Sequence, residues 1–241
     1  MSDERGPVAE VEMPGEASNT LVLAAVVLVA ALVGGGLLAA HRRGRQAREA
    51  LLERLGFRPC PGEKRALTEI LTRVTRDSQH HYEVEEPRRL RGDPPVYYYV
   101  KLRHGGASEA RDAGEEILFR LRRRSKSGVV LVVKPSSLAP GVATRLLSAV
   151  VTSPWATLPD DLHRIELPQD LKDTNLLGAL GPPGASLYDL VDAKLLSVVQ
   201  GLGDAGGMTV QFRDDWCAIA AGHFRVPFRV DELLARLRPL L

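Results

Sequence analysis

A run of 20 uncharged residues, Leu21 to Ala40, constrains this chain more than any other feature. At 1.5 Å per residue, a helix over this run spans about 30 Å, which is the thickness of the hydrocarbon core of a bilayer. Eleven of its residues are Leu or Val, so insertion into a bilayer gains on the order of 3 to 7 kcal/mol. The run therefore predicts a transmembrane helix over residues 20–40.

A cleaved signal peptide is the main alternative for this apolar run. Such a peptide has a basic start, a shorter apolar stretch and small residues at its cleavage site. Here residues 1–19 carry five acidic side chains and one Arg, together with two Pro and two Gly. This composition is typical of a disordered segment. We therefore expect a disordered acidic tail over residues 1–19, followed by an uncleaved membrane anchor.

The charges beside the apolar run predict its orientation. Four arginines follow it, namely Arg42, Arg43, Arg45 and Arg48. The positive-inside rule places this basic flank and everything after it in the cytoplasm, with the N-terminus outside. The excess of Arg over Lys and the abundance of Ala, Gly and Leu indicate a bacterial source. The expected location is the inner membrane, where the anchor makes the chain an integral, single-pass protein.

Ala30 and Gly34 form a small-xxx-small pair within the apolar run. Such pairs let two transmembrane helices pack closely, so a homodimer through this face is one hypothesis. Small residues are also common in bacterial spans that do not pair, and the sequence leaves both alternatives open.

Two further regions follow the anchor. Residues 41–56 have helical spacing and end at Gly56, which predicts a basic juxtamembrane helix or stalk. Residues 57–241 form the expected soluble domain. Residues 41–241 hold 31 basic and 25 acidic side chains. This mild excess suits a neighbour of anionic lipid and falls short of a dedicated nucleic-acid binder, so nucleic acid is not an expected partner.

Hydrophobic spacing predicts the elements of the soluble domain. Helices are expected at Glu63–Thr75, Val142–Val151, Leu171–Leu180, Ser186–Leu202 and Asp231–Leu241, the fourth starting at a Ser186–Asp189 capping pair, and a turn is expected at residues 58–62. Strands are expected at His81–Glu85, Pro95–Arg103, Glu116–Arg123, Gly128–Lys134, Arg164–Leu167, Met208–Arg213 and Trp216–Ala221.

The order of these elements predicts the fold class. Ser125–Gly128 and Asp214–Asp215 each separate two expected strands, which favours two hairpins, and the apolar Gly128–Lys134 run favours a central strand buried on both faces. Strands come in consecutive groups without regular βαβ alternation. We therefore expect an α+β domain with a mostly antiparallel sheet packed by amphipathic helices.

A second basic cluster contains Arg120, Arg122, Arg124 and Lys126, which would share one face of a strand. That face could contact anionic headgroups, at about 1 kcal/mol per basic residue close to the surface. It could instead contact nucleic-acid phosphates. A third alternative is a solvated strand end that pairs with Glu109, Glu115 and Glu116.

Gly201–Gly206 matches the G-x-G-x-x-G pattern of dinucleotide-binding folds. That motif must follow a strand and open a helix, whereas here it ends an expected helix and precedes a strand. It is therefore interpreted as a helix end and turn. Tyr97, Tyr98 and Tyr99 could stack on bases beside Arg103, but their β propensity favours packing within a strand, where at most two share a face.

Metal and cofactor chemistry is not expected. His80 and His81 are adjacent and would face apart on a strand, and Cys60 and Cys217 lack metal-ligand spacing. Cys60 is interpreted as a loop residue and Cys217 as a small core residue. Two cytoplasmic cysteines should stay reduced.

The remaining candidates for chemistry are two carboxylate pairs, Asp160–Asp161 and Asp214–Asp215. Both are expected in turns, where Asp bonds to the backbone. No nucleophile elbow or phosphate-binding loop accompanies them, so no catalytic residue is assigned. The sequence favours a non-enzymatic module that binds a protein partner or the membrane surface. The alternative is a membrane-tethered, hydrolase-like enzyme whose site is assembled from scattered residues.

Overall fold

The computed structural model describes residues 42–78, 80–104, 112–137, 159, 161–172, 174–221 and 229–241, without the side chains of residues 112–113 and 122–127. The chain divides into two compact units, Met1–Leu51 and Leu52–Leu241. The expected tail (1–19) and the expected transmembrane helix (20–40), with its Ala30–Gly34 pair, lie outside the described residues. Within the ranges given above, no helix has the length and apolar character needed to cross a membrane.

Residues 42–51 of the first unit are helical, and the helix continues to residue 54 at the start of the second unit. It is followed by the glycine that the sequence indicates. The Gly56 N–H donates to the carbonyl oxygen of Glu53 at 3.0 Å, and Gly56 has φ of +91°. This left-handed conformation suits glycine because it has no Cβ. Leu52 is buried in the core of the second unit, so the last helical turn is held there.

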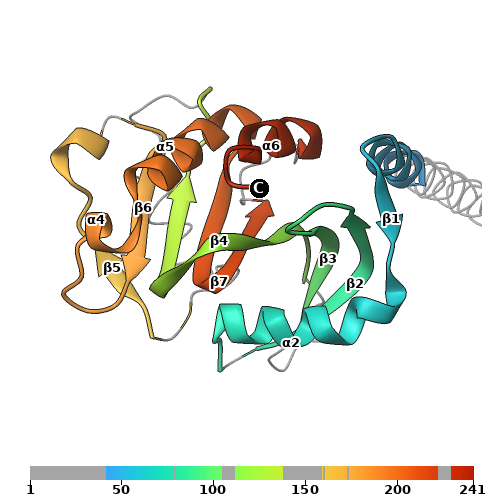
Figure 1. Ribbon diagram of the computed structural model, residues 1–241, viewed down its shortest axis with the longest axis horizontal. Coiled ribbons are helices and arrows are strands. Elements are labelled where there is room, and N and C mark those ends of the chain that lie inside the picture. Colours follow the sequence, from blue (N-terminus) through green and yellow to red (C-terminus); the bar gives the residue numbers. More distant parts are fainter. Residues whose placement is uncertain are drawn as a thin grey trace, which may run out of the picture. The chain divides into compact units, whose positions relative to one another are not determined.

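In the described part of the chain, seven strands form one sheet, and their pairs are antiparallel. They are β1 (Phe57–Pro59), β2 (His81–Leu90), β3 (Val96–His104), β4 (Asp112–Val133), β5 (His163–Ile165), β6 (Leu176–Gly181) and β7 (Met208–Ala221). After residue 54, the α-helices of the described part of the chain are α2 (Lys64–Thr75), α4 (Leu187–Leu190), α5 (Ala193–Gly201) and α6 (Val230–Leu237). Figure 1 shows this α+β arrangement, which confirms the predicted fold class.

The long strands β4 and β7 each contribute to both halves of the sheet. The first half-sheet contains β1, β2, β3, the first part of β4 and the last part of β7, and the second contains the last part of β4, the first part of β7, β6 and β5. The sheet order is β1-β2-β3-β4-β6-β5, with β7 paired to β4 off this path. The first part of β4 pairs with β3 and with Trp216–Ala220 of β7. Its last part, Val129–Val133, pairs with Met208–Phe212 of β7 and, over residues 130–133, with β6. Val129–Val133 is buried throughout, which confirms the predicted central strand.

Both predicted hairpins are wrong. Ser125, in the first expected turn, lies opposite Asp214, in the second. Each strand continues through its expected turn, because register shifts between Arg120 and Val129 accommodate the extra residues of β4. Asp214 takes φ of +55° at this point. Small and polar residues mark a bulged bend as well as a chain reversal, so the local pattern does not distinguish the two.

Several helix boundaries also differ from the prediction. The expected helix Leu171–Leu180 is wrong, because a 3-10 turn at Gln169–Leu171 is followed by β6, which pairs between β4 and β5. The expected long helix from Ser186 is interrupted at Val191, and Asp192 caps α5 by accepting from the N–H of Leu195 at 2.8 Å. Ser186 makes no side-chain cap bond. The expected helix Val142–Val151 lies outside the described residues.

The expected turn at residues 58–62 is also wrong at its start, where β1 forms and a 3-10 turn at Pro61–Glu63 follows. β2 extends past its predicted end at Glu85 to Leu90, across a bulge between Glu85 and Arg88. By contrast, α2 and β3 agree with the predicted Glu63–Thr75 and Pro95–Arg103 within one residue at each end.

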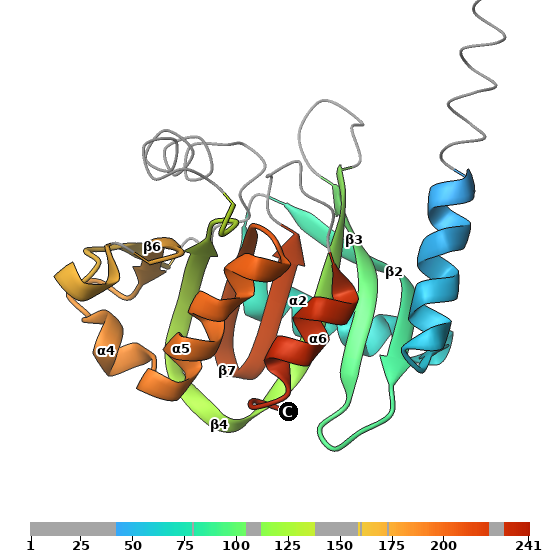
Figure 2. The ribbon, with the colours of Figure 1, turned by 90° about the horizontal axis from the view of Figure 1, so that it is seen from above.

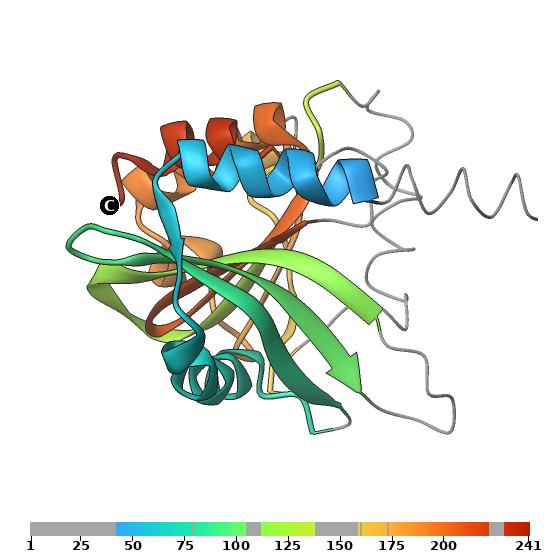
Figure 3. The same ribbon diagram turned by 90° about the vertical axis from the view of Figure 1, so that its right-hand side faces the viewer.

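Two hydrophobic clusters pack against the sheet. The larger contains Tyr98 and Phe119 together with apolar residues of β6, α5 and α6. The smaller packs Leu67 and Leu71 of α2 against Tyr97 and Tyr99. Figure 3 shows α2 on one side of the strands and α5 and α6 on the other, and Figure 2 shows α5 and α6 along β4 and β7. The three tyrosines therefore divide between two cores, as the strand interpretation predicts.

Candidate functional site

The most distinctive polar site lies at the C-terminal end of α2. The last carbonyls of a helix have no partner within the helix. The hydroxyl of Thr75 donates to the Leu71 carbonyl oxygen at 2.9 Å. Arg76 caps the helix with a left-handed φ of +43°, and its N–H donates to the Thr72 carbonyl oxygen at 3.1 Å. The carbonyl of Val74 accepts its bonds from β7.

Two side chains of β7 supply those bonds. Gln211 and Arg213 are two residues apart, so they point to the same face of the strand. The amide nitrogen of Gln211 donates to the Val74 oxygen at 2.5 Å, and Arg213 Nε donates to the same oxygen at 3.2 Å. Both side chains are buried, with Arg213 only 5 % exposed. β7 therefore fixes the end of α2 and holds one buried guanidinium group.

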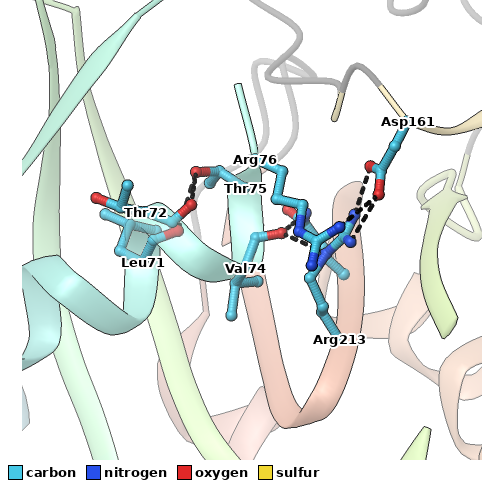
Figure 4. Close-up of polar contacts among 8 residues, drawn as sticks. Leu71, Thr72, Val74, Thr75, Arg76, Asp161 and Arg213 are labelled. Atoms are coloured by element: carbon cyan, nitrogen blue, oxygen red, sulfur yellow. Dashed lines mark hydrogen bonds and ion pairs between the residues drawn. The ribbon is translucent and has the colours of Figure 1, made fainter. Parts of the chain in front are cut away.

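Arg213 also forms a bidentate ion pair with Asp161. Its Nη1 and Nη2 atoms donate to the two carboxylate oxygens at 2.8 and 2.7 Å. Arg76 Nη1 donates to one of these oxygens at 3.2 Å, so two guanidinium groups hold one carboxylate (Figure 4). The Asp161 side chain is 40 % exposed, whereas that of Arg213 is 6 % exposed. We call Arg76, Asp161 and Arg213 the arginine clamp.

Gly128 of β4 provides the space for the clamp. A Cβ atom at this position would lie 2.6 Å from Arg213 Nη2 and 2.7 Å from Cζ. Real Cβ atoms do not approach other atoms so closely, so a larger residue here would displace the guanidinium group. The pairing of Val129 with Phe212 places Gly128 beside Arg213 across the ladder.

Electrostatics in the clamp favour a bound anion. The hydrogen bond from Arg213 holds the pKa of the Asp161 carboxyl below its usual range, and the charges of Arg213 and Arg76 act in the same direction. Charge-assisted bidentate pairs of this kind are the strongest hydrogen bonds that Arg forms. The arrangement of Arg76 and Arg213 can hold a carboxylate or a phosphate.

A second polar cluster lies on the α2 side of the first half-sheet. Glu116 accepts from the Tyr99 hydroxyl at 2.8 Å and from Lys101 Nζ at 3.2 Å. The side chains of Glu116 and Lys101 are 4 % and 13 % exposed. Burial raises the pKa of Tyr99 well above its usual value, and Glu116 adds to that effect. These groups satisfy one another inside the fold.

The expected membrane-surface arginines lie on the helix of the first unit. Arg42, Arg43 and Arg45 are exposed, and Arg48 is half-buried. Arg45 pairs with Glu49 one turn later at 3.3 Å. Arg42, Arg43 and Arg45 are thus accessible to solvent, and the expected contact of the four arginines with a membrane surface stays a prediction.

The second expected basic surface is described only at Arg120. Its Nε atom pairs with the carboxylate of Asp215. The sequence predicts instead that Asp215 lies in a turn and bonds to the backbone. The side chains of Arg122, Arg124 and Lys126 lie outside the description. A cavity of ≈ 290 Å³ beside Arg120 is lined by Asp93, Pro94 and Leu121 as well.

The glycine motif has a structural role. It follows α5 and precedes β7, as predicted. A Cβ atom at Gly203 would lie 2.7 Å from Asn175 Nδ2 and 2.8 Å from the Lys134 carbonyl oxygen. Gly203 is therefore required for close packing of three chain segments. The Asp204 side chain accepts from the Ser136 hydroxyl at 2.6 Å, which holds the same junction.

The histidines and cysteines serve separate environments. His80 Nδ1 lies 2.8 Å from Asp77, whereas His81 faces His104 across the strands with ring centroids 6.3 Å apart. Among the described residues, no three His, Cys, Asp or Glu side chains are placed to hold a metal ion. Burial, with help from Glu63, raises the pKa of the Cys60 thiol to about 11, and full burial raises the pKa of Cys217 well above its usual value.

Sequence reasoning missed the clamp. Asp161 was one of the carboxylate candidates, while its neighbour Asp160 lies outside the described residues. Arg213 alternates with Met208, Val210 and Phe212 along the expected strand Met208–Arg213, and this spacing alone does not indicate that Arg213 is buried. One pattern could have identified Arg213 as part of a site. Gln211 and Arg213 share one face of a strand whose other face is wholly apolar. Comparisons with protein-family models, with curated proteins and with solved structures gave no match to this chain.

Proposed function

We propose that this chain is a single-pass protein of a bacterial inner membrane, with a short external N-terminus and a cytoplasmic α+β domain. The domain acts as a non-enzymatic module that binds a protein partner or the membrane surface. The observation that carries the proposal is the uncharged run Leu21–Ala40, followed directly by a helix on which Arg42, Arg43 and Arg45 are exposed.

Electrostatics support a role at the membrane surface. Each basic side chain close to an anionic leaflet contributes about 1 kcal/mol. Four arginines within seven residues of one helix therefore supply a contact of several kcal/mol, beyond the insertion of the anchor itself. Anionic lipid on the cytoplasmic side would attract this flank and fix the orientation.

Tethering supports the binding-module part of the proposal. A domain held at a membrane meets other membrane components at a high effective concentration, which strengthens weak contacts without new chemistry. The two polar clusters of the second unit agree with this role, since Glu116 and Asp161 are each held by basic side chains of the same fold.

Protease accessibility tests the topology. Protease added to intact cells should leave the C-terminal domain whole, and protease added after permeabilisation should digest it. A variant in which Arg42, Arg43, Arg45 and Arg48 are changed to Gln should show mixed orientation, because the basic flank sets the direction of insertion. Digestion of the wild-type domain from outside intact cells would disprove the orientation.

Mass spectrometry tests the function. The full-length protein, released gently from its native membrane, should carry a stoichiometric protein companion or co-purifying anionic lipid. The same preparation of the four-Gln variant separates companions that need the basic flank from those that bind the domain. A tightly bound metabolite with neither protein nor lipid would overturn the binding-module proposal in favour of an enzyme.

A further inference from the structure

The guanidinium group of Arg213 is held in place independently of Asp161. Its Nε atom bonds to the Val74 oxygen, and the missing Cβ of Gly128 leaves room for its Nη2 and Cζ atoms. Its side chain is 6 % exposed, and Gln211 donates to the same carbonyl oxygen. Loss of Asp161 would therefore leave a buried, oriented pair of N–H donors rather than a mobile side chain.

Asp161 accepts the hydrogen bonds of the two Nη groups of Arg213, and it is the more exposed member of the pair. Asp161 is 40 % exposed and lies in a turn directly before β5, a three-residue strand that pairs only with β6 among the described residues. Its carboxylate bonds to Arg213 and Arg76 (Figure 4). An occupant on a short edge segment can leave without unpairing the central strands.

The charge of the two guanidinium groups determines which anion can replace the Asp161 carboxylate. Two guanidinium groups face one carboxylate among the described residues, and the uncompensated Arg213 is costly to leave buried. A phosphate group carries about −1.5 to −2 charges and three acceptor oxygens. It matches two converging arginines better than a single carboxylate does.

We propose that Arg213 and Arg76 form a phosphate-binding subsite, and that Asp161 is an internal occupant which a phosphate group displaces. Two sources share this chemistry, a phosphomonoester lipid headgroup and a soluble phosphate. The lipid source rests on the proposed membrane function, whereas the subsite itself does not. Binding exchanges one anion for another and breaks no covalent bond.

The test is calorimetric titration of inorganic phosphate into the full chain in nanodiscs of phosphatidylcholine. Asp161→Asn keeps the shape of the side chain and removes its charge. This variant should bind phosphate at least about tenfold more tightly than wild type, since the internal competitor is lost. The matched control is Asp215→Asn, which removes a carboxylate from the Arg120 pair, changes net charge equally and should bind as wild type does.

A second substitution identifies the subsite. Arg76→Gln, added to Asp161→Asn, should reverse most of the gain, because the second guanidinium is lost. Equal phosphate affinity in wild type, Asp161→Asn and Asp215→Asn would overturn the proposal and leave Asp161 as a structural ion pair. If Asp161→Asn is unfolded, phosphate and not an equal ionic strength of chloride should restore its near-ultraviolet circular dichroism; no restoration likewise overturns the proposal.

Nanodiscs that contain phosphatidic acid distinguish the two sources. If the headgroup occupies the subsite, inorganic phosphate should bind Asp161→Asn more weakly in these discs than in phosphatidylcholine alone. Unchanged affinity assigns the subsite to a soluble phosphate. Because the titration does not depend on topology in cells, failure of the protease experiment and failure of the phosphate experiment are separate results.

Discussion

Two acidic side chains of the second unit, Glu116 and Asp161, are held by basic partners in opposite arrangements. Glu116 is itself buried, at 4 % exposure, between Tyr99 and Lys101. At the clamp the base is buried, because Arg213 is 6 % exposed and Asp161 is 40 % exposed. A buried acid is available only to its own fold, whereas a buried base with an exposed acid keeps a site that another anion can enter. The two pairs should therefore respond differently to substitution.

The largest expected effect is at Glu116 and Lys101, which we call the closed pair because both side chains are largely shielded from water. Glu116→Ala leaves Lys101, whose side chain is only 13 % exposed, without its counter-charge. This should destabilise the domain by up to about 3 kcal/mol. Urea denaturation of the full chain in neutral detergent, followed by tryptophan fluorescence, measures the loss. Glu116→Leu combined with Lys101→Met should recover most of it, since an apolar pair of similar volume is often neutral. A cost below about 1 kcal/mol for Glu116→Ala would show that the pair is not closed to water.

The next effect concerns the space beneath the clamp. Gly128→Ala places a Cβ 2.6 Å from Arg213 Nη2, so it should cost about 1 to 3 kcal/mol by overpacking. Gly114→Ala is the matched control on the same strand, since a Cβ at Gly114 meets nothing within 4 Å. Thermal unfolding of both variants compares them. Equal stabilities would mean that Arg213 moves aside freely.

Acid should weaken the clamp, because Asp161 must be ionised to pair with Arg213 and Arg76. Because the folded-state pKa of Asp161 lies below its unfolded value, its contribution is present above the unfolded pKa and is lost as pH falls through the folded pKa. Wild type should therefore lose about 1 kcal/mol below about pH 4, a figure limited by solvent screening. Asp161→Asn should lack that part of the pH dependence in urea titrations at pH 7 and pH 3. An unchanged dependence would assign it to other carboxyls.

The smallest effect extends the comparison to an exposed pair. Arg120 is 59 % exposed in its pair with Asp215, so Asp215→Asn should change stability by less than about 0.5 kcal/mol. Urea denaturation at low and high salt checks this. A larger, salt-dependent loss would show that the bend of β4 and β7 depends on this pair.

The sequence predicts what local periodicity determines and misses what tertiary pairing determines. The α2 and β3 segments have clear apolar spacing and appear where expected. The Leu171–Leu180 segment also has helical spacing, but part of it forms β6 because its backbone pairs with β5 and with β4, which is distant along the chain.

The candidate site was predictable only in part, for the same reason. Asp161 could be singled out as one of a carboxylate pair, but its partner Arg213 lies 52 residues away. The bend of β4 and β7 beside Arg213 is predicted as two hairpins, since Ser-Lys-Ser-Gly and Asp-Asp are typical of turns. Nothing local to Asp214 reports that Ser125 lies opposite it.

The ladder between β4 and β7 has a consequence for how the second unit opens. Each half-sheet contains one part of β4 and one part of β7. Neither half can therefore lose its hydrogen bonds without exposing the adjoining strand residues of the other half. The amides of Val129–Val133 should then exchange with deuterium only through global unfolding, and at the same rate as those of Ile117–Phe119. Any protein or lipid that docks on one half-sheet would in this way raise protection against exchange in both.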